Sequence, residues 1–74
     1  MTPLSVVPPG ESIIVLSFQC GRRLAWRLFE MGILPGARYR VVSNLRRGPV
    51  ILEKDGMRLG LGHGMAEKIL VRVV

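Results

Sequence analysis

Hydrophobic positions between Gly21 and Gly36 follow the spacing of an α-helix. On a helical wheel that starts at Leu24, one continuous arc is apolar, and it comprises Leu24, Ala25, Leu28, Phe29 and Met31. Gly32 marks the end of this helix, because a residue without a Cβ enters the left-handed conformation without a steric penalty. Pro35-Gly36 then predicts a sharp turn. We therefore predict one helix, from Arg22 to Met31, that packs against the rest of the chain.

The other hydrophobic residues lie in short, β-branched runs between glycines and prolines, as is typical of β-strands. Within one run Tyr39 alternates with Arg38 and Arg40, and Asp55-Gly56 is a strong signal for a tight hairpin. The five predicted strands are Glu11–Phe18, Ala37–Ser43, Val50–Lys54, Met57–Leu61 and Ile69–Val74. With the helix inserted after the first strand, they predict a mainly β fold, a small and partly open barrel that residues 1–74 form as a single domain.

Several finer features follow from the same pattern. Leu4, in an extended lead-in, is expected to reach the core. In the second strand of the hairpin, Met57, Leu59 and Leu61 are expected to face inward and Arg58 outward. Residues 44–49 are predicted to form a loop with Arg46 and Arg47 near its tip, and residues 62–68 a short turn or a helical turn.

Trp26, the only tryptophan, lies outside the apolar arc of the helix and between arginines. Two interpretations are open. The ring covers a neighbouring segment while the arginines are solvated, or this side of the helix contacts a partner, because Trp and Arg most often anchor interfaces. The residues of this candidate partner-binding surface are Arg22, Arg23, Trp26, Arg27 and Glu30.

The net charge of +6 favours an acidic protein, nucleic acid or an anionic membrane surface as partner. Five arginines are predicted to share the outer face of the second to fourth strands, as a solvated surface or a binding patch: Arg38, Arg40, Arg46, Arg47 and Arg58. The apolar runs are far shorter than the ~18 residues of a membrane span, and the first residues do not resemble a signal peptide. We expect a cytosolic protein.

The chain offers little material for metal or acid–base chemistry. A closed metal site usually needs about four ligands, so Cys20 and His63 would have to recruit carboxylates such as Glu11 or Glu67. We therefore predict neither an intrinsic metal site nor a cofactor. One histidine and five acids form no persuasive catalytic set, which argues against an enzyme. The glycine-rich segment 60–64 lacks the βαβ context of a phosphate loop, and we interpret it as a link between strands.

Several segments together resemble the FeoA family. They are Leu4, Pro9-Gly10-Glu11, the run from Leu24 to Gly36, Gly48-Pro49-Val50, and Ala66, Ile69 and Val71. The most specific part is R-L-x-E-M-G-I-x-P-G at residues 27–36. The resemblance implies an SH3-like barrel and a small cytosolic accessory of the ferrous iron transporter FeoB, a membrane protein with a G domain. It also implies transition metal ion binding at the level of the family and action through protein–protein contact, and a regulatory effect on the transporter's GTPase has been proposed for the family.

Two alternatives stay open. The chain could be a basic SH3-like barrel that binds nucleic acid, although its four aromatic residues lack the spacing of a base-stacking platform. It could also be a free-standing relative of the C-terminal domain of iron- and manganese-dependent repressors. The resemblance favours contact with the cytosolic part of the transporter. The chain is then expected to lie at the membrane only through this partner, and no nucleic-acid ligand is expected. Self-association is left open.

Overall fold

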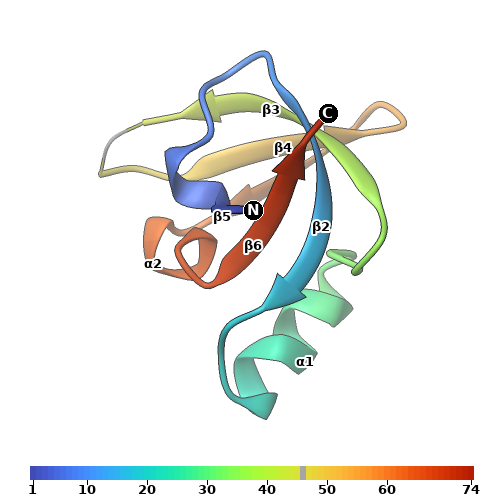
Figure 1. Ribbon diagram of the computed structural model, residues 1–74, viewed down its shortest axis with the longest axis vertical. Helices are drawn as coiled ribbons and strands as arrows, with labels where there is room; N and C mark the ends of the chain where they lie inside the picture. The colour runs from blue at the N-terminus through green and yellow to red at the C-terminus, as the bar shows by residue number, and fades with distance from the viewer. Residues whose placement is uncertain (46) are drawn as a thin grey trace.

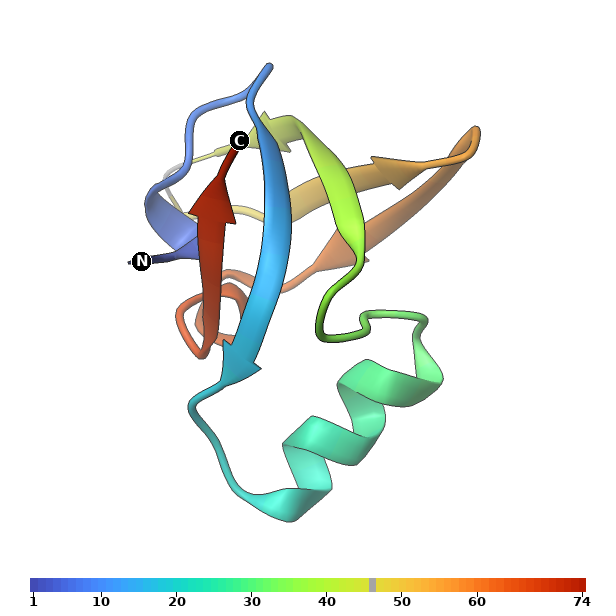
Figure 2. The same ribbon diagram turned by 45° about the vertical axis from the view of Figure 1, so that its right-hand side comes forward.

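A computed structural model of the protein describes residues 1–45 and 47–74. Within these residues, six antiparallel strands form one sheet in the order β1-β6-β2-β3-β4-β5. The strands are β1 (Thr2–Pro3), β2 (Ser12–Phe18), β3 (Arg38–Asn44), β4 (Val50–Lys54), β5 (Met57–Leu61) and β6 (Ile69–Val73). The helices are the 3₁₀ helix η1 (Leu4–Val6), α1 (Arg22–Glu30) and α2 (His63–Ala66). The sheet curls into a small barrel, and α1 lies across one end of it (Figures 1 and 2).

The predicted mainly β barrel with a helix after the first long strand is confirmed, and β1 adds a short sixth strand at the edge. The hairpin of β4 and β5 has the predicted bounds, and Lys54 pairs with Met57 across its turn. Asp55 and Gly56 have φ values of 51° and 81°, as a tight hairpin turn with two left-handed central residues requires. Arg46, predicted near the tip of the preceding loop, lies outside the described residues.

Two register shifts help the sheet to curl. One falls between Val15 and Ser17 where β2 pairs with β6, and the other between Val41 and Ser43 where β3 pairs with β4. An extra residue in one strand of an antiparallel pair bends that strand and increases its twist. A sheet of such short strands can therefore wrap around a single core.

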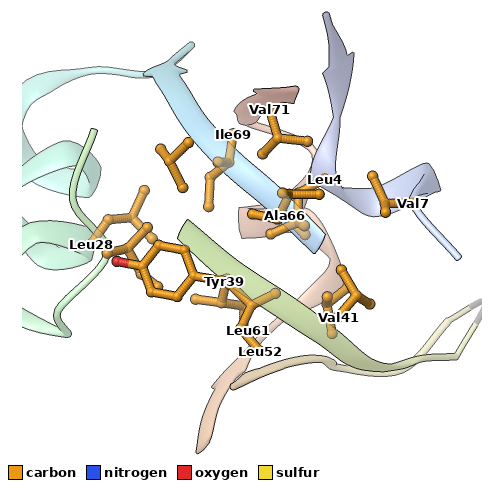
Figure 3. Packing of buried hydrophobic residues seen from close by; sticks show 14 residues of the cluster. Leu4, Val7, Leu28, Tyr39, Val41, Leu52, Leu61, Ala66, Ile69 and Val71 are labelled. Carbon is orange, nitrogen blue, oxygen red and sulfur yellow. The ribbon is translucent and has the colours of Figure 1, made fainter. Parts of the chain in front are cut away.

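The core lies inside the barrel and receives side chains from nearly every element (Figure 3). Leu4 is buried as predicted, and in β3 the buried Tyr39 and Val41 alternate with the exposed Arg38 and Arg40. The core residues are Leu4, Val7, Ile13, Val15, Leu28, Ile33, Tyr39, Val41, Val50, Leu52, Leu61, Ala66, Ile69 and Val71.

The inward position predicted for Met57 is wrong. Its side chain is 69% exposed, whereas Leu61 at the other end of β5 is fully buried. Met57 is the first residue after the hairpin turn, and at this end the hairpin projects away from the rest of the barrel (Figure 2). Alternation within a strand therefore identifies the side chain's face, but not how far along the strand the core reaches.

The C-terminal end of α1 is fixed to the barrel by a Schellman motif. Gly32, with φ of 91°, donates its N–H to the Phe29 carbonyl at 3.0 Å, and Ile33 donates its N–H to the Leu28 carbonyl at 2.9 Å. Leu28 and Ile33 are both fully buried, so the polar motif is accompanied by an apolar contact with the core. The position of the helix is therefore well defined at this end.

Tyr39 ties the turn that follows α1 to the sheet. Its hydroxyl donates to the Gly32 carbonyl at 2.6 Å and accepts a hydrogen bond from the Leu34 N–H at 3.1 Å. Figure 3 shows the ring beside Leu28. One buried side chain thus joins β3, the helix end and the turn.

We expect Tyr39→Phe to lower the free energy of unfolding by about 1–2 kcal/mol, because the Gly32 carbonyl and the Leu34 N–H lose their shared partner in a partly buried site. Urea denaturation measures the change. Ser17→Ala is the control, since it also removes a hydrogen-bonded hydroxyl, but an exposed one. Equal midpoints for Tyr39→Phe and the parent would contradict this role.

Candidate functional site

The outer side of α1 borders an open apolar groove of about 640 Å³. Its walls come from the end of β2, the exposed side of α1 and the turn that follows the helix. The lining residues are Phe18, Arg22, Ala25, Trp26, Phe29 and Pro35. Most of this lining is hydrophobic and reachable from solvent, which makes the groove the strongest candidate for a contact site among the described residues.

Trp26 and Phe29 form a stacked pair on this groove. Their ring centroids are 5.6 Å apart and the ring planes differ by 15°. Trp26 is 63% exposed and Phe29 is 52% exposed. Residues three apart in a helix lie on the same face, so each ring covers part of the other while both stay open to solvent.

The prediction for Phe29 is therefore corrected. The apolar arc placed it against the core with Leu24, Leu28 and Met31, but the stripe that packs on the barrel is narrower. Phe29 lies beyond its edge and joins Trp26 on the outer side. Trp26 itself is 63% exposed, so most of its ring can be reached from solvent.

The five residues of the predicted partner-binding surface are all exposed on α1. Arg22 and Trp26 line the groove, whereas Arg23, Arg27 and Glu30 are on the same helix but outside the lining. The sequence prediction missed four lining residues: Phe18, Ala25, Phe29 and Pro35. The spacing of Trp26 and Phe29 could have identified one of them, but the other walls depend on how β2 and the turn pack beside the helix.

The charges at the start of α1 oppose the helix dipole. Arg22 and Arg23 occupy its first turn, which has no acidic residue, and Gly21 provides no side-chain cap. Cations near a helix N-terminus are unfavourable by some tenths of a kcal/mol each. In the described part of the chain, both ion pairs involve Glu53, so no arginine of α1 has a carboxylate within 4.0 Å. These arginines are thus left available to an external anionic group.

Glu53 on β4 lies between two arginines of the sheet. Arg40 Nη2 donates to Glu53 Oε1 at 2.8 Å, and Arg58 Nε is 4.0 Å from Oε2. The hydrogen bond and the charge of Arg40, with a smaller effect of Arg58, lower the pKa of the Glu53 carboxyl. The folded state therefore holds this carboxylate ionised to lower pH than the unfolded chain does.

This lowered pKa predicts a pH-dependent stability. Between the lowered pKa of Glu53 in the folded state and the ordinary glutamate pKa, the unfolded chain binds more protons than the folded one. The ion pair therefore stabilises the fold fully above the ordinary pKa, and this stabilisation is lost as the pH falls through the lowered pKa. We expect Glu53→Gln to lower the thermal midpoint near neutral pH and to match the parent in acid. A constant difference between the two proteins at all pH values would contradict this.

The candidate metal ligands are not gathered into a site. Cys20 lies between β2 and α1, whereas His63 begins α2 and Glu67 follows it. Among residues 1–45 and 47–74, no group of three or more His, Cys, Asp or Glu side chains is placed to hold a metal ion. Likewise, no helix in this part of the chain is long and apolar enough to cross a membrane.

These features define a small SH3-like barrel that exposes an aromatic groove beside its one long helix. A family model for the FeoA domain matches residues 2–73, and the chain belongs to this family. It is 38% identical over 71 residues to the "Putative Fe(2+) transport protein A" of Methanocaldococcus jannaschii, a match that covers 96% of this chain and 85% of the relative. The family relationship places the chain among the accessories of ferrous iron transport.

Solved structures agree with this assignment. The crystal structure of an iron uptake regulatory protein (FeoA) matches with a TM-score of 0.91 and 34% identity, over 99% of this chain and 97% of that one. FeoA of Stenotrophomonas maltophilia, solved in complex with zinc and described as a prokaryotic SH3 domain protein, matches with a TM-score of 0.76 and 28% identity. That match covers 97% of this chain and 89% of the other. The SH3-like fold expected from the sequence is thus confirmed.

We expect the monomer of this chain to bind no stoichiometric ferrous iron, because its soft and borderline ligands are too few and too scattered. Anaerobic calorimetry with Fe²⁺ is the measurement. A one-to-one site with a Kd of about 1 μM or tighter would contradict the prediction. His63→Ala would then be the first variant to examine, because His63 Nδ1 is buried without a hydrogen-bond partner.

Proposed function

We propose that this chain is a non-enzymatic, cytosolic accessory of ferrous iron uptake that binds the cytosolic G-domain part of a FeoB-type transporter. The family relationship supports the transport role. The observation that supports the contact is the exposed Trp26–Phe29 stack on the groove, with Arg22 in the same lining. We place the docking surface on this side of α1.

The groove has the composition of an interface centre. Aromatic rings bring a large contact area at a small cost in side-chain entropy, and Trp and Arg are enriched among residues that dominate binding energy. Trp26 and Phe29 lie on a helix whose end is fixed by the buried Leu28 and Ile33. The rings are therefore presented in a defined geometry before the partner arrives, which reduces the cost of ordering them on binding.

Charge indicates what kind of surface fits the groove. Arg22 lines the groove with the aromatic pair, Arg23 and Arg27 are exposed on the same helix, and Glu30 is the only acid of α1. The whole chain carries +6, so a second copy would bring a surface of the same sign. An apolar side chain flanked by carboxylates, on the cytosolic part of the transporter, is the complementary surface. Arg22 and Arg23 weaken their own helix, which is consistent with a role outside folding.

Chemical-shift mapping tests this proposal. The isotope-labelled chain is titrated with the purified cytosolic domain of a FeoB-type transporter. We expect the Trp26 indole N–H and the amides of α1 and residues 32–36 to shift or broaden first, because they surround the groove. The same titration with a random oligonucleotide tests the alternative of nucleic-acid binding. Changes confined to the strands, or seen with the oligonucleotide alone, would contradict the proposal.

A further inference from the structure

The outer face of the sheet carries a second charged surface, away from the groove. Ile14 on β2 pairs with Arg38 on β3 and with Arg72 on β6, so these side chains form one row across three strands. A second row crosses four strands. Ser12 on β2 pairs with Arg40 on β3. Glu53 on β4 pairs with Arg40 on one side and with Arg58 on β5 on the other. Opposite residues have Cβ atoms about 5 Å apart, so both rows are continuous. Figure 2 shows β6, β2 and β3 side by side.

The two rows combine four arginines with one carboxylate. Arg40 and Arg58 share Glu53, whereas Arg38 and Arg72 have no carboxylate within 4.0 Å among the residues that the structure describes. A shallow depression of about 280 Å³ opens beside the rows, and its lining adds Lys54 but also Asp55: Ser12, Arg38, Tyr39, Arg40, Glu53, Lys54 and Asp55. Cations are in excess over acids here, and exposed cations without partners attract anions.

We infer that this face, comprising Ser12, Ile14, Arg38, Arg40 and Arg72 and called the arginine face below, binds the anionic surface of a lipid bilayer. Its arginines alternate with aliphatic side chains, since Ile14 and, further along the outer face, Leu16 and Leu70 are only partly buried. Arg and Lys side chains near an anionic bilayer each contribute about 1 kcal/mol of attraction. Partly exposed aliphatic groups between them suit the interfacial region, which accommodates apolar and charged groups together.

A nucleic-acid ligand fits this face less well. Single strands are held by aromatic side chains on which the bases stack, between cations that contact the phosphates. Aromatic rings are not offered to a base here: Tyr39 borders the depression but is only 2% exposed, and Phe18, Trp26 and Phe29 line the groove beside α1. The arginine face therefore has the positive charge that either a nucleic acid or an anionic bilayer requires. Between its charges, however, it offers aliphatic rather than aromatic groups.

The arginine face and the groove are on separate parts of the molecule. Ser12 and Ile14 lie in the first half of β2, whereas α1 lies beyond the other end of that strand, after residues 19–21 (Figure 1). Contact with a bilayer would therefore leave the groove open to a partner at the membrane surface. The inference goes beyond the proposed transporter contact and does not depend on it.

Sedimentation with vesicles tests the inference on the whole chain. Vesicles of pure phosphatidylcholine are compared with vesicles in which about one third of the lipid is phosphatidylglycerol, at about 0.1 M salt. We expect binding to the anionic vesicles alone, and loss of that binding at about 0.5 M salt. The double variant Arg38→Gln/Arg72→Gln is expected to bind roughly thirtyfold more weakly, from two lost cations at the surface.

A matched control separates the arginine face from net charge. Arg47→Gln/Lys68→Gln removes two exposed cations from loops outside the rows and should bind the vesicles within about threefold of the parent. Arg38→Lys/Arg72→Lys keeps the charge and should restore binding if the glutamine variant folds poorly. The inference would be overturned by equal losses of binding in both glutamine variants, or by the absence of any binding to anionic vesicles. It would also be overturned if a single-stranded oligonucleotide bound more tightly than the vesicles and through Arg38 and Arg72.

Discussion

Replacement of Leu28 by alanine is expected to lower the free energy of unfolding by about 2–5 kcal/mol. Leu28 is the one residue of α1 that is fully buried, and its carbonyl also accepts the Ile33 N–H that ends the helix. The truncated side chain would leave a cavity between α1 and the barrel, which the fixed helix end prevents from closing. Since a small domain has a stability of about 5–15 kcal/mol, this loss is a large part of the whole.

Phe29→Ala is the matched control for this prediction. It removes a larger side chain from the adjacent position of the same helix, but one that is 52% exposed. We expect it to destabilise the fold less than Leu28→Ala does, in urea denaturation under the same conditions. A larger loss of stability for Phe29→Ala than for Leu28→Ala would mean that the helix packs through its aromatic side. An unchanged urea midpoint for Leu28→Ala would mean that Leu28 is not part of the core.

Features of the fold that depend on neighbouring residues were predictable from the sequence. Gly32 and Asp55-Gly56 adopt the left-handed conformations that end the helix and close the hairpin, and these depend on local sterics. The alternation of Arg38 and Tyr39 also gave the correct faces of β3. In each case the residue type restricts the backbone or the side chain without help from distant segments.

The groove could be predicted only in part. Trp26 and Arg22 were identified because they fall outside the apolar arc of the helix. Phe18 and Pro35 come from β2 and from the turn after α1, and no periodicity in the sequence shows that they meet the helix. Phe29 was assigned to the core because a helical wheel gives the direction of a side chain, but not the width of the stripe that the barrel covers.

The arginine face required the strand register. Arg38, Arg40 and Arg58 were predicted on an outer face together with Arg47, which lies in the predicted loop between β3 and β4. Arg72 was not included, because β6 is far from these residues in the chain. Only the pairing of Ile14 with both Arg38 and Arg72 brings them into one row. Long-range strand pairing is therefore the information that the sequence pattern lacked.

Trp26→Ala is expected to leave the protein folded and to weaken its binding to the cytosolic domain of a FeoB-type transporter by more than tenfold, or about 1.4 kcal/mol. The ring is 63% exposed and contacts Phe29 rather than the core, so its loss changes the surface and little else. A large aromatic side chain that lines an apolar groove is the kind of residue whose truncation costs most in an interface.

Met57→Ala is the control for surface hydrophobicity. Met57 is 69% exposed, similar to Trp26, but lies on the hairpin of β4 and β5 and outside the groove. We expect this variant to bind the cytosolic domain as the parent does. A similar loss in both variants would indicate a general hydrophobic attraction, and a much lower thermal midpoint for Trp26→Ala would assign the ring a structural role.

The most direct test of the account is a calorimetric titration of the transporter's cytosolic domain with the parent chain and with Trp26→Ala, both shown to be folded at the working temperature. We expect saturable binding of the parent and at least tenfold weaker binding of the variant, because the groove beside α1 is the proposed docking surface. Equal affinity of the two proteins for the domain would contradict it.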